Sequence, residues 1–154
     1  MKLASALKLR VNLLKQLSEL SNTIHKGLVV QEGMNQTDPN DSYIKYTTKL
    51  GQLEQLIVDI NYTNVFTLVS FKGCEISIAE LLLLKDEAKQ KENTIQSILQ
   101  NSEEEKIADV NDIRMVSVVD RDKYQKKLDA AKDEMLAIEL ALEEANWEVS
   151  LKKL

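Results

Sequence analysis

Apolar residues recur every three or four positions toward the end of this 154-residue chain, and no other feature constrains the fold as tightly. Steps of three and four keep side chains on a single face of an α-helix, so a helix over residues 124–149 carries one continuous apolar stripe. The stripe consists of Tyr124, Leu128, Ala131, Met135, Ile138, Leu142, Ala145 and Val149. Such a pattern specifies the packing of one helix against another.

Three earlier segments show the same period, so we expect helices over residues 2–26, 39–64 and 77–100 as well. Asp38 and Pro39 form a start signal, because an aspartate side chain accepts first-turn amides and proline suits the first helical position. Ser77 and Glu80 match a capping box. Asp120 is placed to cap the fourth helix.

Two short segments rich in β-branched residues read as strands, and they are Leu28 to Gln31 and Ile113 to Val118. We expect them to pair. Residues 65–75 suit either a helix end or a strand, with a turn at Lys72 and Gly73.

The predicted fold is all-α: an antiparallel bundle of four long helices, with a short two-stranded β ribbon at one end. Four glycines and one proline supply few turns, which disfavours a β-sandwich, and the length suits a single helical domain over residues 1–154. The apolar stripes are wider than one neighbouring helix can cover. We therefore expect a homo-oligomer.

Charge and composition exclude several classes of partner. A net charge of −5 argues against nucleic acid, because neutralising phosphates needs a basic surface. The longest apolar cluster is much shorter than the ~20 residues of a membrane span, so we expect no membrane partner. A single cysteine, Cys74, rules out an intrachain disulfide and fits a reducing cytoplasm.

Enzymatic templates are missing from the sequence. The only histidine, His25, has no second histidine and no nearby cysteine with which to form a metal site or a nucleophile pair. The four glycines are scattered and form no phosphate-binding loop. We therefore expect a protein that is not an enzyme, with no metal and no cofactor.

Polar residues occupy several positions where the apolar pattern calls for hydrophobic ones or where a strand is predicted. They are Arg10, Asn64, Lys85, Asp86, Arg114 and Asn146. A buried charge is costly unless it is paired, so two interpretations compete. The arginines either form internal ion pairs that fix helix register, or they face a pocket and hold an anion. Trp147 and the tyrosines are interpreted as core or interface anchors.

Several short segments also occur in a characteristic order. They are Met1 to Ala4 with Arg10, Val30 to Gly33 followed by Asp38-Pro39, Ile60 to Asn64, Lys85-Asp86, Asp112 to Arg114, Val119-Asp120, and Asn146 to Glu148. Together they resemble the septicolysins, a family of small bacterial helical proteins mostly without assigned function. The family pattern tends to have Arg-Asp where this chain has Lys85-Asp86, which loses a bidentate fork. The resemblance implies a mostly helical fold with a short β element and self-association.

The polar misfits and the matching segments together define a candidate ligand-binding set, which is Arg10, Asn61, Thr63, Asn64, Lys85, Asp86, Arg114 and Asn146. Our leading hypothesis is a non-enzymatic cytoplasmic binding protein that holds or sequesters a small anionic ligand such as a nucleotide. The family name suggests a membrane-active cytolysin as the alternative. A purely structural homo-oligomeric assembly protein is the third hypothesis.

Overall fold

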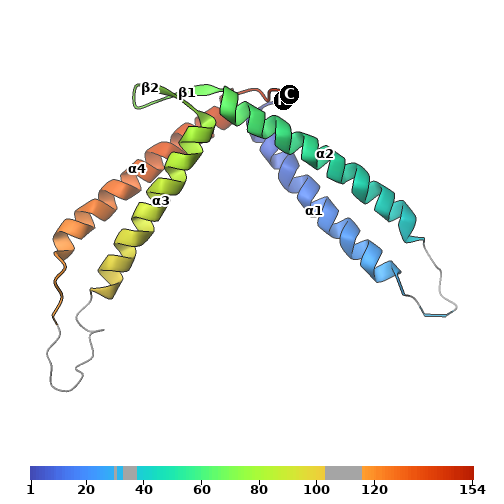
Figure 1. The fold of residues 1–154 in the computed structure, drawn as a ribbon, viewed down its shortest axis with the longest axis horizontal. Coiled ribbons are helices and arrows are strands. Elements are labelled where there is room, and N and C mark those ends of the chain that lie inside the picture. Colours follow the sequence, from blue (N-terminus) through green and yellow to red (C-terminus); the bar gives the residue numbers. More distant parts are fainter. Residues whose placement is uncertain (30, 33–37, 103–115) are drawn as a thin grey trace, which may run out of the picture. The chain divides into compact units, whose positions relative to one another are not determined.

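The computed structural model describes residues 1–29, 31–32, 38–102 and 116–154, and within them the chain is mostly helical (Figure 1). The elements are α1 (Leu3–Gly27), α2 (Pro39–Phe66), β1 (Leu68–Phe71), β2 (Cys74–Ser77), α3 (Ile78–Asn101) and α4 (Arg121–Glu148). They form two compact units. Unit 1 comprises Met1–Thr67 with Ala145–Leu154, and unit 2 comprises Leu68–Glu144.

The predicted helix starts are confirmed. The Asp38 side chain accepts a hydrogen bond from the Asn40 amide at 2.9 Å, with Pro39 at the first helical position. Ser77 and Glu80 form the complete capping box at the start of α3. Asp120 accepts from the Lys123 amide at 3.0 Å and so caps α4. Each contact satisfies an amide that the first helical turn leaves without a partner.

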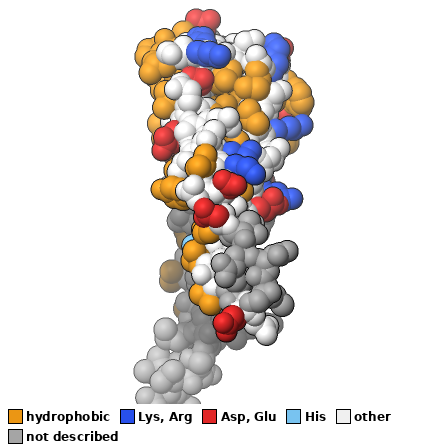
Figure 2. Space-filling view, turned by 90° about the vertical axis from the view of Figure 1, so that its right-hand side faces the viewer, with side chains coloured by type: hydrophobic (Ala, Val, Ile, Leu, Met, Phe, Trp, Pro, Cys, Tyr) orange, Lys and Arg blue, Asp and Glu red, His pale blue; other side chains and the backbone are white. Residues whose placement is uncertain are grey.

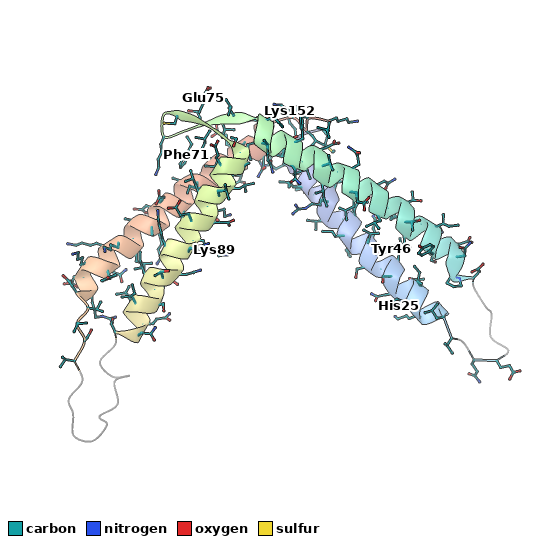
Figure 3. The ribbon with its side chains drawn as sticks, viewed as in Figure 1. His25, Tyr46, Phe71, Glu75, Lys89 and Lys152 are labelled. Atoms are coloured by element: carbon teal, nitrogen blue, oxygen red, sulfur yellow. The ribbon has the colours of Figure 1, made fainter. Side chains whose placement is uncertain are left out.

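In unit 1, α1 and α2 run antiparallel and side by side (Figure 1). Each helix buries one stripe against the other: Ala6, Leu13 and Leu17 on α1, and Leu53, Leu56 and Ile60 on α2. The Lys49 ammonium spans the pair and donates to Gln16 Oε1 at 2.6 Å. His25 and Tyr46 lie toward the end of the pair away from Lys152 (Figure 3).

Unit 2 packs α3 against α4. The start of α3 meets the later part of α4 through an ion pair of 2.9 Å between Lys85 and Glu139. At the other end of α3, the Arg121 guanidinium donates to the Leu99 carbonyl at 2.9 Å. No member of the predicted α4 stripe is exposed, because residues 128, 131, 138, 142 and 145 are buried and 124, 135 and 149 are half-buried. That stripe is therefore confirmed as the packing face of the helix.

The small sheet is a β-hairpin in unit 2, in which Leu68 pairs with Ser77 and Phe71 with Cys74. Its two-residue turn is Lys72-Gly73, as predicted, and both residues have positive φ angles of 50° and 81°. Positive φ at both central positions is the type I′ geometry, whose twist matches that of two antiparallel strands. The Lys72 ammonium then reaches Glu134 of α4 at 3.5 Å.

The predicted position of the ribbon was wrong. Residues 28–29, 31 and 116–118 belong to no strand, while Val30 and residues 113–115 lie outside the described residues. The sheet forms instead within residues 65–75 and just beyond, where the sequence left helix and strand open. A tight turn lets neighbouring segments pair at little entropic cost, whereas residues 28–31 and 113–118 are far apart in the chain.

A helical fold with a small two-stranded sheet is thus confirmed, while the packing of all four helices into one bundle stays a prediction, as does the single domain.

Not every expected apolar position is buried: Leu14, Tyr43, Ile57 and Leu84 are exposed. Figure 2 shows hydrophobic side chains reaching the surface between charged ones on the face that it draws.

The capping box supplies a test with a defined pH dependence. The amide and hydroxyl of Ser77 donate to Glu80 at 2.7 and 2.8 Å, and these hydrogen bonds lower the pKa of Glu80 below its ordinary value near 4.5. A carboxylate whose pKa is lowered by folding stabilises the protein above that ordinary value, and the contribution disappears as the pH falls through the lowered pKa. Glu80→Ala should therefore lower the melting temperature at pH 7.

The difference from wild type should shrink as the pH is taken below about 4, where the carboxylate becomes protonated. Thermal unfolding followed by circular dichroism at a series of pH values measures it. Glu144→Ala is the matched control, because Glu144 is an exposed helical glutamate with no hydrogen bond or ion pair to any described residue. A pH-independent difference for Glu80→Ala would contradict the electrostatic explanation.

Candidate functional site

The termini of the described chain meet at one end of unit 1. The Leu3 amide donates to the Val149 carbonyl at 2.9 Å, and the Leu151 amide donates to the Met1 carbonyl at 2.8 Å. Residues 149–151 therefore run antiparallel to residues 1–3. We call residues 149–154 the C-terminal strap. It follows α4 directly, so the last turn of α4 is fixed beside the first turn of α1.

The end of α2 is fixed to the same strap by Thr63, whose side chain is completely buried. Its hydroxyl donates to the Asp59 carbonyl at 2.7 Å and accepts from the Lys152 amide at 2.9 Å. The Lys152 ammonium donates to the Phe66 carbonyl near the end of α2 (Figure 3). Thr63, a candidate ligand-binding residue, thus has its hydroxyl engaged in holding the strap against the end of α2.

Two lysines of the first turns bind the end of α4. The Lys2 ammonium donates to the Glu148 carbonyl at 2.6 Å, and a cation at a helix C-terminus is favourable because that end carries partial negative charge. The Lys8 ammonium lies 5.3 Å from the ring centroid of Trp147, a cation–π contact. Trp147 is 54% exposed, so it is not a core residue.

Arg10 lies on the side of α1 that faces α2, two turns from this end. The residue is half-buried, and its Nε atom is buried without a hydrogen-bond acceptor among the described residues. Arg10 also forms no ion pair with any residue that the structure describes. The hydroxyl of Thr67, directly after α2, is likewise buried and without a partner in the described chain. Buried polar atoms normally find a partner, so both positions need an explanation.

Three asparagines of the candidate set belong to the same unit. Asn61 and Asn64 lie in the last two turns of α2, and Asn146 lies in the last turn of α4. Asn64 and Asn146 are half-buried, and Asn61 is exposed. None of the three side chains makes a hydrogen bond with the described part of the chain. Each one therefore keeps a free amide donor and a free carbonyl acceptor at the end of unit 1 that the strap closes.

The remaining candidates are placed differently. Lys85 and Asp86 belong to unit 2, where the Lys85 ammonium is paired with Glu139 and Asp86 is exposed. Arg114 lies outside the described residues. The structure therefore brings together Arg10, Asn61, Thr63, Asn64 and Asn146 in one unit, and it does not place Lys85 or Asp86 with them.

Sequence reasoning missed Asp59, Thr67 and the strap itself. Asp59 is buried, and its carboxylate accepts from Gln55 Nε2 at 3.0 Å and lies 3.4 Å from the Leu154 amide. One sequence signal was available: Asp59 and Thr63 are four residues apart and so lie on the same face of α2, close to the buried Leu56 and Ile60. Polar residues in such positions indicate buried hydrogen bonds. The strap left no signal, because its bonds to residues 1–3 are made by backbone atoms.

Unit 2 has an open groove of about 410 Å³ between α3 and α4. Its cations already have partners: the Glu87 carboxylate accepts from Lys91 at 2.7 Å and raises the pKa of Lys91, and the Lys127 ammonium lies 4.7 Å from the ring centroid of Tyr124. Among the described residues, no group of His, Cys, Asp and Glu side chains is arranged to hold a metal ion. No described helix is both long enough and apolar enough to cross a membrane.

The fold and the site define a class of small helical proteins built from helical pairs, with a β-hairpin and a strap that closes one end of the first pair. Within this class, the chain belongs to DUF6847, a family of unknown function whose sequence pattern matches residues 10–151. It is also similar to a crystal structure of a functionally unknown conserved protein from Corynebacterium diphtheriae, with a TM-score of 0.86, 24% identity and 99% coverage of both chains. No curated protein matches it. The resemblance to septicolysins stays a prediction.

The strap yields a test at Thr63. Thr63→Val keeps the shape of the side chain but removes the hydroxyl that bonds to Asp59 and Lys152. A buried hydrogen-bonding group that loses its partner costs about 1–3 kcal/mol, so the free energy of unfolding should fall by roughly that amount. Urea denaturation measures the loss. Thr48→Val is the control, because the Thr48 hydroxyl bonds only to the Ile44 carbonyl in an exposed turn of the same helix. Equal effects of the two changes would contradict a special role for Thr63.

Proposed function

We propose that this protein is a non-enzymatic cytoplasmic binding protein that holds a small anionic ligand, such as a nucleotide, at the end of unit 1 closed by the strap. One observation supports this most directly: Arg10 keeps a buried guanidinium nitrogen for which the described chain provides no acceptor. An arginine in that state gains from an external anion, because charge-assisted hydrogen bonds are the strongest kind that its donors make.

The surroundings of Arg10 add support. Asn61, Asn64 and Asn146 belong to the same unit, and their side-chain amides have no hydrogen-bond partner among the described residues. Lys2, Lys8, Lys152 and Lys153 give this end a local excess of positive charge, although the chain as a whole carries −5. Such a local potential attracts anions even to an acidic protein. The exposed ring of Trp147 offers a surface on which a flat base can stack.

The described residues of unit 1 include few of the groups that commonly act in catalysis. Within unit 1 the only histidine is His25, which is exposed near the end of α1, and the only buried carboxylate is that of Asp59, held by Gln55. Neither forms a nucleophile and base pair with another described residue. Binding without chemistry is therefore the activity that we propose.

Calorimetric titration with ATP and with inorganic phosphate tests the proposal. Arg10→Met should weaken ATP binding by roughly 10- to 100-fold, because each charged hydrogen bond contributes about 1.5–3 kcal/mol. In ligand-free protein the same change should leave the melting temperature unchanged or raised, because no described carboxylate loses a partner. Phosphate binding alone would identify the anion subsite without the base.

Lys45→Met is the matched control, because it removes one exposed positive charge from α2 at the end of unit 1 away from the strap. It should leave ATP affinity unchanged. Two results would overturn the proposal: no binding of ATP or phosphate to wild type, or a loss of about 3–5 kcal/mol in ligand-free Arg10→Met, which indicates an internal ion pair. The second result would favour a purely structural assembly protein.

The membrane-active alternative calls for a separate measurement. Dye-filled vesicles of phosphatidylcholine and phosphatidylglycerol should retain their dye at pH 7 in the presence of micromolar protein. The helices bury apolar stripes against one another and must separate before they can reach lipid, and a net charge of −5 repels an anionic bilayer. Rapid dye release would instead place the cytolysin hypothesis first.

A further inference from the structure

Unit 1 exposes more apolar surface on one side of its helix pair than on the other. Val11 and Leu14 of α1 are 62% and 50% exposed, and Tyr43 and Ile57 of α2 are 57% and 37% exposed. Leu7, Tyr46 and Leu50 adjoin them and are half-buried. We call these seven residues the second face, to distinguish them from the stripes that pack α1 against α2.

Helix geometry places the seven residues on a single side of the pair. Along α1, Leu7, Val11 and Leu14 are displaced from the buried Ala6, Leu13 and Leu17 in one rotational sense around the axis. Along α2, Leu50 and Ile57 are displaced in the same sense from the buried stripe. In two antiparallel helices that touch along their stripes, the same sense of rotation leads to the same side of the pair.

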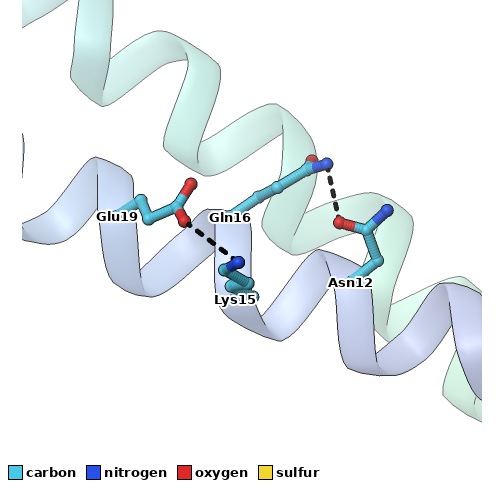
Figure 4. Close-up of polar contacts among 4 residues, drawn as sticks. All are labelled: Asn12, Lys15, Gln16 and Glu19. Atoms are coloured by element: carbon cyan, nitrogen blue, oxygen red, sulfur yellow. Dashed lines mark hydrogen bonds and ion pairs between the residues drawn. The ribbon is translucent and has the colours of Figure 1, made fainter.

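The opposite side of the pair carries more polar groups, several of which are bonded to one another, beside the exposed Leu9 and Ile44. Gln16 Nε2 donates to Asn12 Oδ1 at 3.0 Å (Figure 4), and Gln16 Oε1 accepts from Lys49. Gln55 is bonded to Asp59 on α2. The second face has no comparable set of hydrogen bonds within the described chain, so apolar contact is the interaction that it can offer.

The side of the pair that carries the second face is as large as a protein interface. Helix α1 has 25 residues and is about 38 Å long, and two helices side by side are roughly 20 Å wide. The whole side of the pair therefore covers roughly 750 Å², close to the ~800 Å² that each partner contributes to a stable interface. The seven residues of the second face occupy about 20 Å of its length, so they would form the apolar core of such an interface and the rest of the side its polar rim.

The edges of the second face carry opposite charges. Lys15 lies along the α1 edge, next to Glu19 with which it forms an exposed ion pair of 3.9 Å (Figure 4), and Lys26 follows three turns later on the same edge. On the α2 edge lies Glu54, which is exposed and has no partner in the described chain. A surface with a basic edge and an acidic edge is complementary to itself after a half-turn.

We infer that a second copy of this chain packs its second face against the first, about a two-fold axis parallel to the helices. This axis places α1 of one copy over α2 of the other, so that four helices bury both apolar faces and Lys15 approaches Glu54 of the second copy. The arrangement is argued from the described residues of unit 1 and does not require a ligand at Arg10.

Sedimentation velocity over a range of protein concentrations tests the inference. Wild type should be a dimer at micromolar concentration. Val11→Asp and Ile57→Asp should each raise the dimer dissociation constant at least about 100-fold, because a charge would be buried in the interface. Leu9→Asp and Ile44→Asp are the matched controls, since these residues are 41% and 53% exposed on the opposite side of the same helices. The controls should leave the dimer intact.

Charge reversal tests the proposed axis. Glu54→Lys should weaken the dimer and make it more sensitive to low salt, and combining it with Lys15→Glu should restore much of the affinity. Circular dichroism of each variant checks that the helices remain folded. A wild-type monomer at all concentrations would overturn the inference, as would a dimer disrupted equally by changes on both sides. The proposed axis would be wrong if Val11→Asp weakens the dimer but the double variant does not regain dimer affinity.

Discussion

A pair of helices can bury only one stripe on each helix, and this constraint determines much of the structure of unit 1. Ala6, Leu13 and Leu17 of α1 meet Leu53, Leu56 and Ile60 of α2, and the described residues of the unit form no third long helix. Apolar residues beyond these stripes stay exposed to water unless another molecule packs against them. The hydrophobic effect thus holds the pair together and also leaves the apolar remainder on the surface.

The open end of the pair is closed by polar contacts instead. Thr63 is fully buried, and its hydroxyl serves as donor toward Asp59 and acceptor from Lys152, so one side chain satisfies both α2 and the strap. The Lys2 ammonium donates to the Glu148 carbonyl at the end of α4. Buried hydrogen bonds contribute modestly when made but are costly to lose, which makes this closure specific in its geometry. It also fixes the backbone next to Asn64 and Asn146.

Local chemistry in the sequence was a reliable guide to where helices begin and which face of α4 packs. Asp38, Ser77 and Asp120 each bond to an amide two or three residues further along the chain, and every member of the α4 stripe is buried or half-buried. The predicted position of the sheet was wrong because a segment rich in β-branched residues does not reveal which other segment it pairs with. The ligand-binding set stays a prediction: Arg10 and three asparagines of the set belong to one unit, but Lys85 and Asp86 do not join them. Apolar and polar spacing along one helix carries no information about which helices are neighbours.

Arg10 and Val11 are consecutive on α1, and this connects the two proposals physically. Arg10 lies toward α2, while Val11 points to the side where a second copy would pack, so both interactions constrain the same turn of helix. An anion that orders the Arg10 side chain also changes the charge next to the second face. Linkage then requires that any effect of the anion on dimer affinity be matched by an equal effect of dimerisation on anion affinity. A cluster of positive charge is most costly when a second copy adds its own, so bound anions favour the dimer wherever the two sites lie close enough to sense each other.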